Sequence, residues 1–398
     1  MSGRAPVPGS SAATALRAAS VTHRFGSVLA LEEVSLAVFP GEFVSLLGPS
    51  GSGKTTLLRI IAGLVLPSQG AIFIGDRDVT RLPTQARGIG LVFQSYALFP
   101  HLSVFENIAY PLRIRRVRGA ELSRRVLAVL AKVNLSGLGQ RFPAELSGGQ
   151  QQRVAVARAL VYEPALLLMD EPLGALDRKL RQHMQRELRK LQRDLGITCI
   201  YVTHDQEEAL TMSDRVAVMH HGRILQLDSP VTLYQRPTER FVADFIGRTN
   251  FLSCIVLGRQ GECHLLRTEG GVELSAPSAR LYPAGSAVEL AIRSERIELQ
   301  RERSPETPIE AKVALVTFAG NTTELACTLA GGDEVAVQVP APMSDLGAGA
   351  EVWIGWSPGD VTLFAASPAP SLRSRATERR DSQTRAHSDQ GAERHAAG

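Results

Sequence analysis

Apolar residues form short continuous blocks in the first part of the chain, and longer helical patterns separate these blocks. The blocks are 43–47 (FVSLL), 89–93 (IGLVF), 165–169 (ALLLM), 199–203 (CIYVT) and 215–219 (RVAVM). Strands that are apolar without alternation are typical of parallel sheets covered by helices on both faces. The pattern therefore predicts an α/β domain with a mostly parallel sheet.

The stretch from about 95 to 160 has no such block and shows helical periodicity instead. It contains VFENIAYPLRI, ELSRRVLAVLAKV and a third helical pattern that follows the segment LSGGQ. We expect a helical subdomain inserted between two strands of the sheet.

After about residue 247 the helical periodicity ends and β-rich stretches begin, with Gly, Pro and Asn between them. These stretches are SAVELAIR, AKVALVTFAG, TELACTLA, EVAVQVP, EVWIGW and DVTLF. Short strands at this spacing predict a small β-barrel or sandwich. We expect four segments: a disordered extension over 1–17, the α/β domain over 18–247, a β-rich domain over 248–366 and a disordered tail over 367–398.

Composition adds limits rather than a function. The 398 residues are 44% hydrophobic and 21% charged with a net charge of +4, as in a globular protein of two or three domains. The arginine-rich tail is interrupted by acidic residues and is expected to be solvated, so no nucleic-acid partner is predicted. Four cysteines without a CxxC pair indicate a reducing compartment. No apolar run reaches the roughly 20 residues that span a bilayer, so a cytosolic location is expected.

Residues 48–55, GPSGSGKT, match the spacing GxxxxGK[ST] between a strand and a helix. Glycines let backbone N–H groups curl toward phosphate oxygens, and the positive end of the next helix adds to the attraction. Lys54 then reaches the β- and γ-phosphates, and the Thr55 hydroxyl ligates Mg²⁺. The other interpretation is a glycine-rich turn that binds nothing. The predicted nucleotide-binding residues are Gly48, Pro49, Ser50, Gly51, Ser52, Gly53, Lys54, Thr55 and Thr56.

Polar side chains end three of the predicted strands. Asp170 is placed to hold Mg²⁺, and Glu171 to deprotonate an attacking water. The alternative for this pair is a helix cap with an acid in the first turn. Gln94 can touch Mg²⁺ or water, and His204 can donate to a γ-phosphate oxygen, although a lone histidine is more often structural. We predict catalytic roles for Glu171, His204 and Gln94, and metal ligation by Thr55, Gln94 and Asp170.

A second helix start with anion-binding character follows about a hundred residues after the first. In LSGGQQQR, Gly148 and Gly149 open a helix whose positive end favours an anion. The chain therefore has two such helix starts and only one lysine of the phosphate-loop kind.

These motifs together resemble the ATP-binding cassette family over about residues 18–250. The phosphate loop, Gln94, LSGGQ, LLLMDE, GALD at 174–177 and His204 occur in that family's order. The resemblance implies an ATPase with a P-loop core that binds ATP and Mg²⁺. It also implies that Phe25 stacks on adenine, and that Asp177 lies in the loop joining two active sites. Gly174 stands where many cassettes have serine.

The family also explains the two helix starts, because two cassettes pack head to tail in a dimer. The LSGGQ segment of one closes over the ATP held by the other's phosphate loop. The resemblance therefore assigns Ser147, Gly148, Gly149 and Gln150 to the partner's nucleotide, and a homodimer is the simplest source of the second cassette.

A single cassette followed by a small β domain is similar to the ATPase subunit of bacterial importers, whose tail is an oligonucleotide-binding-type barrel, or TOBE domain. FPHLSVFENIAYPLR, GITCIYVTHDQEEALTMSDRVAVM and FVADFIGRTNFL resemble the spermidine/putrescine branch more than the maltose branch. The ATPase subunits of importers of iron(III), phosphonate, thiamine and sulfate have similar sequences in these stretches. AIRSERI has Ser294 where proline is common.

The importer resemblance implies two transmembrane permease subunits as partners, and indirectly a periplasmic or extracellular solute-binding protein. The chain would then lie on the cytoplasmic face of the inner membrane, with the permease docked near Tyr96 to Asn107. Ordinary packing is the alternative for Tyr96, Phe99 and Phe105. Two other functions stay open: a soluble cassette that acts on a macromolecule, and a regulator that binds ATP without cleaving it. Glu171 and His204 disfavour the regulator.

Overall fold

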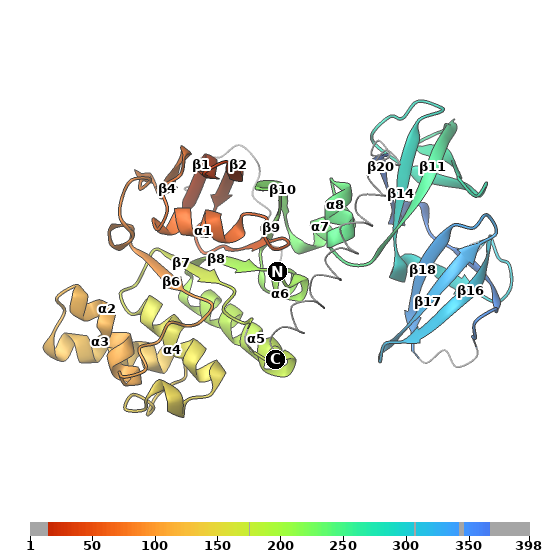
Figure 1. The fold of residues 1–398 in the computed structure, drawn as a ribbon. Coiled ribbons are helices and arrows are strands. Elements are labelled where there is room, and N and C mark those ends of the chain that lie inside the picture. The colour runs from red at the N-terminus through yellow and green to blue at the C-terminus, as the bar shows by residue number, and fades with distance from the viewer. Residues whose placement is uncertain (1–14, 175, 306–307, 342–345, 367–398) are drawn as a thin grey trace, which may run out of the picture. The chain divides into compact units, whose positions relative to one another are not determined.

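The computed structural model describes residues 15–174, 176–305, 308–341 and 346–366, and the chain divides into two compact units, Met1–Gly247 and Arg248–Gly398 (Figure 1). The first strand begins at Leu16, so the expected disordered extension over 1–17 is wrong for Leu16 and Arg17. Its residues up to 14, and the expected disordered tail over 367–398, lie outside the described residues.

A six-stranded sheet forms the centre of the first unit. In spatial order its strands are β10 (Arg223–Asp228), β9 (Arg215–His220), β3 (Phe43–Leu47), β8 (Thr198–Thr203), β7 (Leu166–Asp170) and β6 (Ile89–Val92). Every neighbouring pair is parallel except β9 and β10. The prediction of a mostly parallel sheet is confirmed, and each predicted block lies within one residue of its strand.

Burial on both faces explains why these strands are apolar without alternation. In β7, Leu166 and Leu168 pack into one core cluster, whereas Leu167 and Met169 pack into another. Successive side chains of a strand point to opposite faces. Each face of β7 therefore has its own apolar layer, and no position along it suits a polar residue until the strand ends.

A second sheet, antiparallel and four-stranded, lies on one side of the first. It consists of β2 (Val28–Val38), β1 (Leu16–Phe25), β4 (Gln69–Ile74) and β5 (Arg77–Asp78), and it shares a core with α1 (Lys54–Ala62). The sequence pattern did not predict this sheet. The reason is that β1 pairs with β2 through register shifts, which interrupt the two-residue alternation.

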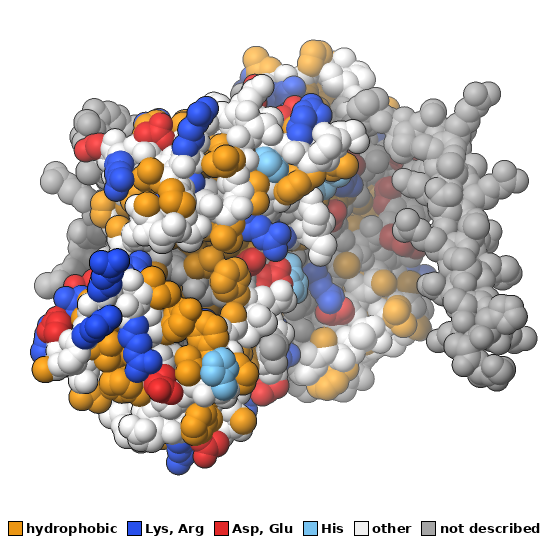
Figure 2. All heavy atoms as spheres, turned by 60° about the vertical axis from the view of Figure 1, so that its left-hand side comes forward, with side chains coloured by type: hydrophobic (Ala, Val, Ile, Leu, Met, Phe, Trp, Pro, Cys, Tyr) orange, Lys and Arg blue, Asp and Glu red, His pale blue; other side chains and the backbone are white. Residues whose placement is uncertain are grey.

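The predicted helical subdomain is present between β6 and β7. It contains α2 (Val104–Ile114), α3 (Gly119–Lys132) and α4 (Gly148–Leu160), with a 3₁₀ turn at Pro143–Glu145. The three helices bury a common apolar cluster. Figure 2 shows hydrophobic side chains among charged ones on the face that this subdomain presents.

The remaining helices of the first unit are α5 (Arg178–Leu195), α6 (Gln206–Met212), α7 (Pro230–Gln235) and α8 (Arg240–Phe245), with a 3₁₀ turn at Thr84–Ala86. Helices α6, α7 and α8 cover the sheet near β3 and β9. No helix among the described residues is long and apolar enough to cross a membrane.

The second unit has two five-stranded antiparallel sheets around one core. The first sheet contains β13 (Glu273–Pro277), β12 (Cys263–Thr268), β11 (Thr249–Gln260), β14 (Ala287–Arg293) and β20 (Val361–Ala365). The second contains β15 (Glu298–Gln300), β19 (Glu351–Gly355), β16 (Ile309–Phe318), β17 (Thr322–Leu329) and β18 (Glu334–Pro340), and 3₁₀ turns lie at Ser294–Arg296 and Pro358–Asp360. The predicted all-β character is confirmed, while β11, β12, β13 and β15 were not among the predicted stretches.

Candidate nucleotide-binding site

The phosphate loop joins β3 to α1 at the edge of the sheet where the parallel strands end. Gly51 and Gly53 have φ angles of 79° and 100°, which favour glycine. A Cβ on Gly48 would lie 2.2 Å from the carbonyl oxygen of Met219, so the neighbouring strand also excludes a side chain there. The glycines are therefore required by the path of this loop.

Lys54 and Ser52 direct polar groups into the phosphate loop. The buried Lys54 ammonium donates to the carbonyl oxygens of Gly48, at 2.7 Å, and Pro49, at 2.9 Å. Burial lowers the pKa of Lys54, and the carboxylates of Glu171 and Asp170 oppose this shift. The Ser52 hydroxyl is buried without a partner. An ammonium and an unpaired hydroxyl in a glycine cradle fit a phosphate chain.

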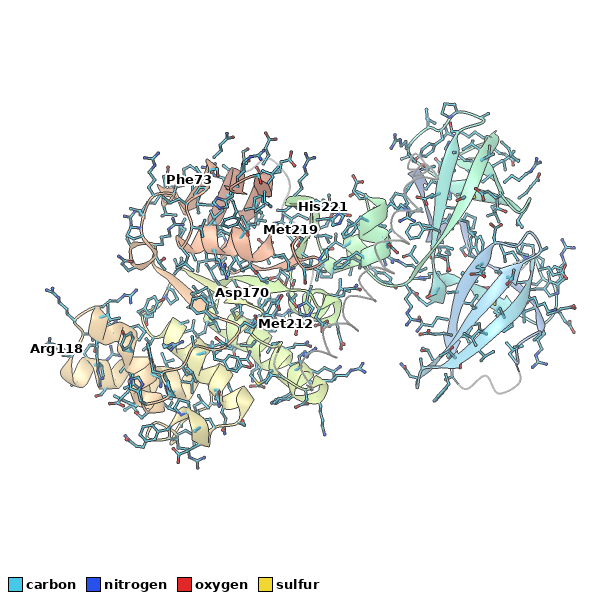
Figure 3. The ribbon with its side chains drawn as sticks, in the orientation of Figure 1. Phe73, Arg118, Asp170, Met212, Met219 and His221 are labelled. Atoms are coloured by element: carbon cyan, nitrogen blue, oxygen red, sulfur yellow. The ribbon has the colours of Figure 1, made fainter. Side chains whose placement is uncertain are left out.

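Of the three side chains expected to hold the metal ion, Thr55 and Asp170 meet at the ends of different elements, whereas Gln94 contacts Glu171. The Thr55 hydroxyl, on α1, donates to Asp170 Oδ1 over 3.3 Å. Asp170, labelled in Figure 3, is the last residue of β7. Burial raises the pKa of Asp170, and the hydrogen bond from Thr55 opposes this shift. Among the described residues, no group of three or more His, Cys, Asp and Glu could hold a metal ion. Two oxygen donors suit Mg²⁺, which shares its coordination with phosphates and water.

The three residues predicted to be catalytic lie together. His204 Nδ1 is 3.1 Å from Glu171 Oε1, and Gln94 Nε2 donates to Glu171 Oε2 over 3.5 Å. Glu171 has a φ of 43°, in the left-handed region, which is uncommon for a residue with a side chain. Strained backbone of this kind is found at active sites. The Glu171 carboxylate is therefore held between an imidazole and an amide.

The segment Ser147–Gln150 forms the N-terminus of α4, away from the phosphate loop. The backbone N–H of Ser147 donates to Gln150 Oε1, at 3.0 Å, and that of Gln150 donates to Ser147 Oγ, at 3.4 Å. Among the described residues, no hydrogen bond joins this segment to residues 48–55. The Ser147 oxygen accepts in this cap, so its proton is left for another acceptor.

The two residues that only the family resemblance singled out have different surroundings. Phe25 is the last residue of β1 and is 53% exposed, with His23 edge-on to its ring at 4.5 Å between centroids. Asp177 is the N-cap of α5 and accepts from the backbone N–H of Leu180 at 2.9 Å. An exposed aromatic ring is available for stacking, while Asp177 has a structural partner within its own chain.

The loop after β6 and the start of α2 contain the aromatics expected near a permease. Tyr96 is buried, so ordinary packing accounts for it, while Phe99 and Phe105 are half-buried. Tyr96 and Ala97 have φ angles of 58° and 46°, and the Arg158 guanidinium donates to both of their carbonyl oxygens. Arg158 therefore holds a backbone conformation that side chains disfavour.

Three further residues beside His204 escaped sequence reasoning. Around the start of α6, Tyr201 donates a hydrogen bond to Glu208, and Arg181 forms ion pairs with Glu208 and Asp205. Arg181 is one of several arginines on α5, and the Glu208 position looks like any acid in a first helical turn. No signal in the sequence separates Arg181 and Glu208 from solvated residues, and Tyr201 was recognised only as part of a buried strand.

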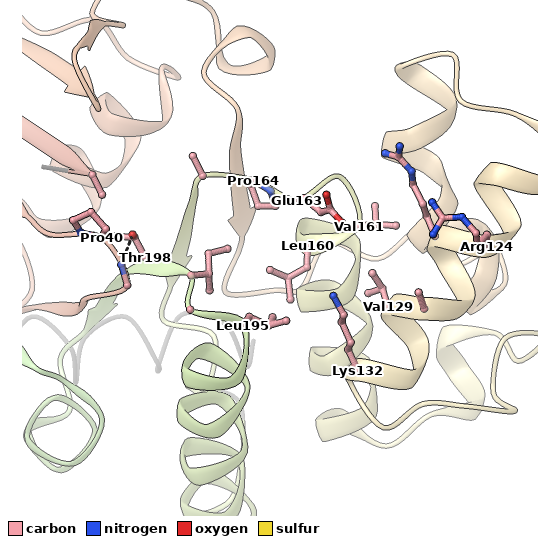
Figure 4. A pocket seen from close by; sticks show the side chains of 17 residues that line it. Pro40, Arg124, Val129, Lys132, Leu160, Val161, Glu163, Pro164, Leu195 and Thr198 are labelled. Atoms are coloured by element: carbon pink, nitrogen blue, oxygen red, sulfur yellow. Dashed lines mark hydrogen bonds between the residues drawn. The ribbon is translucent and has the colours of Figure 1, made fainter. Parts of the chain in front are cut away.

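A cavity of about 530 Å³ lies at the opposite edge of the same sheet (Figure 4). Its lining includes Pro40, Val129, Lys132, Leu160, Pro164 and Leu195. Strands β7 and β8 begin beside this cavity, whereas Asp170 and His204 lie where they end. It is therefore separate from the candidate nucleotide site.

Comparison with known proteins gives matches to both units. The family model described as ABC transporter matches residues 31–174, and the one described as TOBE domain matches residues 290–364. The spermidine/putrescine import ATP-binding protein PotA of Rubrobacter xylanophilus is 53% identical over 312 residues, which are 78% of this chain and 82% of that protein. The protein of the same name from Frankia alni is 50% identical over 349 residues, covering 83% of this chain and 74% of that protein.

A solved structure gives the same result for the fold. The cbiO1 protein of Clostridium perfringens, part of the ABC transporter complex cbiONQ, has a TM-score of 0.52 and 29% identity, and the match covers 55% of this chain and 89% of that chain.

Proposed function

Because the chain belongs to the ABC transporter family, we propose that it is the ATP-hydrolysing subunit of an importer of spermidine and putrescine. Its relatives in Rubrobacter xylanophilus and Frankia alni, which share about half of its residues, carry the name of that import protein. The observation that carries the catalytic part is the convergence of Lys54, the Thr55–Asp170 pair and the Glu171 group at one sheet edge.

The chain's residues divide the work of ATP cleavage. The phosphate loop and Lys54 bind the β- and γ-phosphates, and Phe25 stacks on adenine. Thr55 and Asp170 hold Mg²⁺, which when bound stabilises the charge that develops on the phosphate oxygens. Gln94 supports this ion or the water beside it.

Glu171 takes a proton from the attacking water, as its position between His204 and Gln94 allows. Because His204 Nδ1 faces this carboxylate, Nε2 is the nitrogen left for a phosphate oxygen.

The second anion site, at Ser147–Gln150, contacts the nucleotide that a second copy of the chain binds. Two copies packed head to tail place the helix start at Ser147–Gln150 over the ATP of the partner. The free hydroxyl proton of Ser147, the bare Gly149 backbone and the positive end of α4 then face the γ-phosphate. Asp177 lies near the junction of the two sites. Closure requires ATP, because only the closed pair contacts each nucleotide from both sides.

The complex places this dimer on two transmembrane permease subunits at the cytoplasmic face of the inner membrane, with a solute-binding protein outside. The proposed permease contact is the segment of residues 96–107, which consists of the loop after β6 and the first turn of α2. It is anchored by the buried Asn107, whose amide donates to the carbonyl oxygens of Phe99, Leu102 and Ser103. A loop fixed in this way, beside Gln94, can report the state of the site to the permease.

The proposal can be tested by measuring polyamine uptake in cells whose gene for this chain has been deleted and then restored as wild type or as a variant. Cells that regain the wild-type chain should accumulate labelled spermidine and putrescine, and cells with Glu171→Gln should not. Glu163→Gln is the matched control, because Glu163 is remote from the site and also has a left-handed φ of 55°. Uptake of iron(III), phosphonate, thiamine or sulfate in place of polyamines would correct the solute and keep the ATPase.

A further inference from the structure

Arg181, near the start of α5, joins two loops of the site through one guanidinium group. Nη2 donates to the carbonyl oxygen of Leu176 at 2.9 Å, and Nη1 donates to Asp205 Oδ2 at 3.2 Å. Nε lies 3.9 Å from Glu208 Oε1. A planar guanidinium with several donors can hold acceptors on different elements at once, which a lysine ammonium does less well.

Glu208, one of the acidic partners of Arg181, helps to fix Thr203 and Asp205, the two neighbours of His204. The buried Glu208 carboxylate accepts from the hydroxyls of Tyr201, at 2.8 Å, and Thr203, at 2.7 Å. Thr203 Oγ1 in turn accepts from the backbone N–H of Asp205 at 2.9 Å. Residues 203 and 205 are therefore both held by the group that Arg181 contacts, and His204 stands between them.

Leu176, whose carbonyl oxygen accepts from Arg181, contacts the start of the LSGGQ helix α4. A Cβ built on Gly148 would lie 3.2 Å from Leu176 Cδ2, so the Leu176 side chain packs against the start of α4. Its carbonyl is held by Arg181, and the next residue, Asp177, caps α5. A displacement of Gly148 is therefore passed to Leu176 by direct packing and to Arg181 by a hydrogen bond.

We propose that Arg181 is a positioning residue that links the LSGGQ helix start to His204 of the same chain. In the dimer, whose existence is part of the proposed function, this path connects the nucleotide that a protomer covers in its partner with the one that it binds itself. Closure over the partner's ATP presses on Gly148 and Leu176, and Arg181 and Asp205 carry the displacement to His204. Each protomer then sets its own histidine for catalysis only when it has closed on its partner.

Hydrolysis by the full-length chain tests this path, with Arg181→Gln as the main variant. We expect kcat to fall about tenfold, which is at the lower end of the activity losses caused by removing a residue that orients a site residue. The Kd of a fluorescent ATP analogue should stay the same, because Arg181 touches no residue of the phosphate loop. Arg181→Lys keeps the charge beside Asp205 and Glu208 and should still lose most of kcat.

Gln182→Ala is the matched control. Gln182 Nε2 donates to Glu207 Oε1 over 2.8 Å and joins the same two helices on their exposed side. Loss of this bond should leave kcat unchanged. A loss of kcat like that of Arg181→Gln would show that any contact between α5 and α6 matters, and would overturn the inference.

Double variants separate positioning from general damage. On a His204→Ala background, Arg181→Gln should cause no further loss in single-turnover hydrolysis, since its effect passes through the missing ring. Leu176→Ala should lower kcat, and adding it to Arg181→Gln should change nothing more. Additive losses in either pair would overturn the proposed path.

His204→Ala alone distinguishes a failure of the proposed function from a failure of this inference. If it hydrolyses ATP at the wild-type rate, the role of His204 in the proposed function fails, and this inference fails with it. If it loses activity while both Arg181 variants keep theirs, only the inference fails.

Discussion

Burial shifts the pKa in opposite directions for Lys54 and Asp170, two charged residues of the nucleotide site that interact electrostatically. It lowers the pKa of Lys54 and raises the pKa of Asp170, so both side chains are pushed toward their neutral forms. Each is also among the groups that oppose the other's shift. A site of this kind gains from a ligand that brings both a negative phosphate and a positive ion.

Because the pKa of Asp170 is raised, we predict that Mg²⁺ binding weakens at a higher pH than it would at an ordinary aspartate. Only the carboxylate form binds the ion, so protons compete with Mg²⁺ from a higher pH than at an ordinary aspartate. As pH falls below this pKa, the Mg²⁺ affinity should drop by about tenfold per pH unit. Mg²⁺ titrations of fluorescent ATP-analogue binding, made at a series of pH values from neutral down toward the ordinary aspartate pKa of about 3.9, measure this loss.

Asp170→Asn is the reference for the Mg²⁺ titration. It cannot lose a proton from this position, so its weaker Mg²⁺ dependence should change little over the same range. Parallel slopes in the variant and the wild type would assign the effect to the nucleotide's own phosphates.

Glu171→Gln should keep ATP binding and slow hydrolysis by about 100-fold or more, the scale of general base catalysis. The amide keeps the shape of the side chain and can still contact His204 and Gln94, but it cannot accept the proton of water. Phosphate release and nucleotide binding, measured on the same protein, separate the two effects. A variant that turned over at nearly the wild-type rate would exclude Glu171 as the base.

Sequence reasoning found most of the candidate site residues because each one ends a recognisable element. Asp170 follows a buried strand, Lys54 opens a helix after a glycine loop, and His204 follows another strand. Parallel strands carry their ends to one edge, so these side chains must meet. Arg181 could not be found in this way, because its partners come from residues before α5 and after β8, and only the packing of α5 beside α6 unites them.

At the scale of elements, the start of α4 has a capping role and a proposed binding role in the same four residues. The capping box between Ser147 and Gln150 fixes the first turn within the protomer. Helix α2 has the same kind of box, formed by Ser103 and Glu106, and no proposed ligand. The cap alone therefore does not make an anion site, and the two glycines that follow Ser147 distinguish the two helices.

Ser147→Asp separates these roles. Aspartate is as good an N-cap as serine, so the thermal stability of the protein should change little. Its negative charge would face the partner's γ-phosphate, and ATP-dependent dimerisation should be lost while each monomer still binds ATP. Fluorescent ATP-analogue binding and light scattering measure the two properties on the same sample.

Ser147→Ala and Ser103→Ala are the controls for the cap. Each should cost about 1 kcal/mol of stability through the lost cap, and Ser103→Ala should dimerise normally. Dimerisation by Ser147→Asp, or loss of ATP binding by its monomer, would contradict the arrangement of two shared nucleotides.

The elements that were predicted and those that were missed differ in regularity. Strands β3, β6, β7, β8 and β9 are buried on both faces, so their apolar runs are unbroken and were recognised. Strands β1 and β11 each pair with a neighbour through register shifts, and some of their exposed positions are apolar, namely Phe25 in β1 and Ile255 and Leu257 in β11. A period of two is lost at such a shift, and only the pairing in three dimensions restores the sheet.

At the scale of the whole molecule, every proposed nucleotide contact lies in the first unit, and the two halves of a site are separated within one chain. The phosphate loop lies on the six-stranded sheet, and the LSGGQ helix start lies in the helical subdomain. The second unit has a core of its own and none of the proposed contacts. A complete site therefore needs two chains, and this requirement can be tested by combining two incomplete ones.

Lys54→Ala and Ser147→Asp should each fail to dimerise with ATP alone and should associate when they are mixed. Lys54→Ala lacks a working phosphate loop. In a homodimer of Ser147→Asp, both LSGGQ segments carry a repulsive charge. In a mixed dimer, one site pairs the intact loop of the Ser147→Asp chain with the intact LSGGQ of the other. At the other site, the introduced aspartate faces a loop that holds no ATP, so the repulsion is absent.

Placing both changes on a Glu171→Gln background prevents hydrolysis from dissolving the mixed dimer. Energy transfer between separately labelled chains, measured against ATP concentration, reports the association. The mixed pair should associate more weakly than Glu171→Gln itself, because one nucleotide bridges it instead of two. A mixture with no more transfer than either variant alone would mean that one chain completes its site without the other, and the head-to-tail arrangement would be wrong.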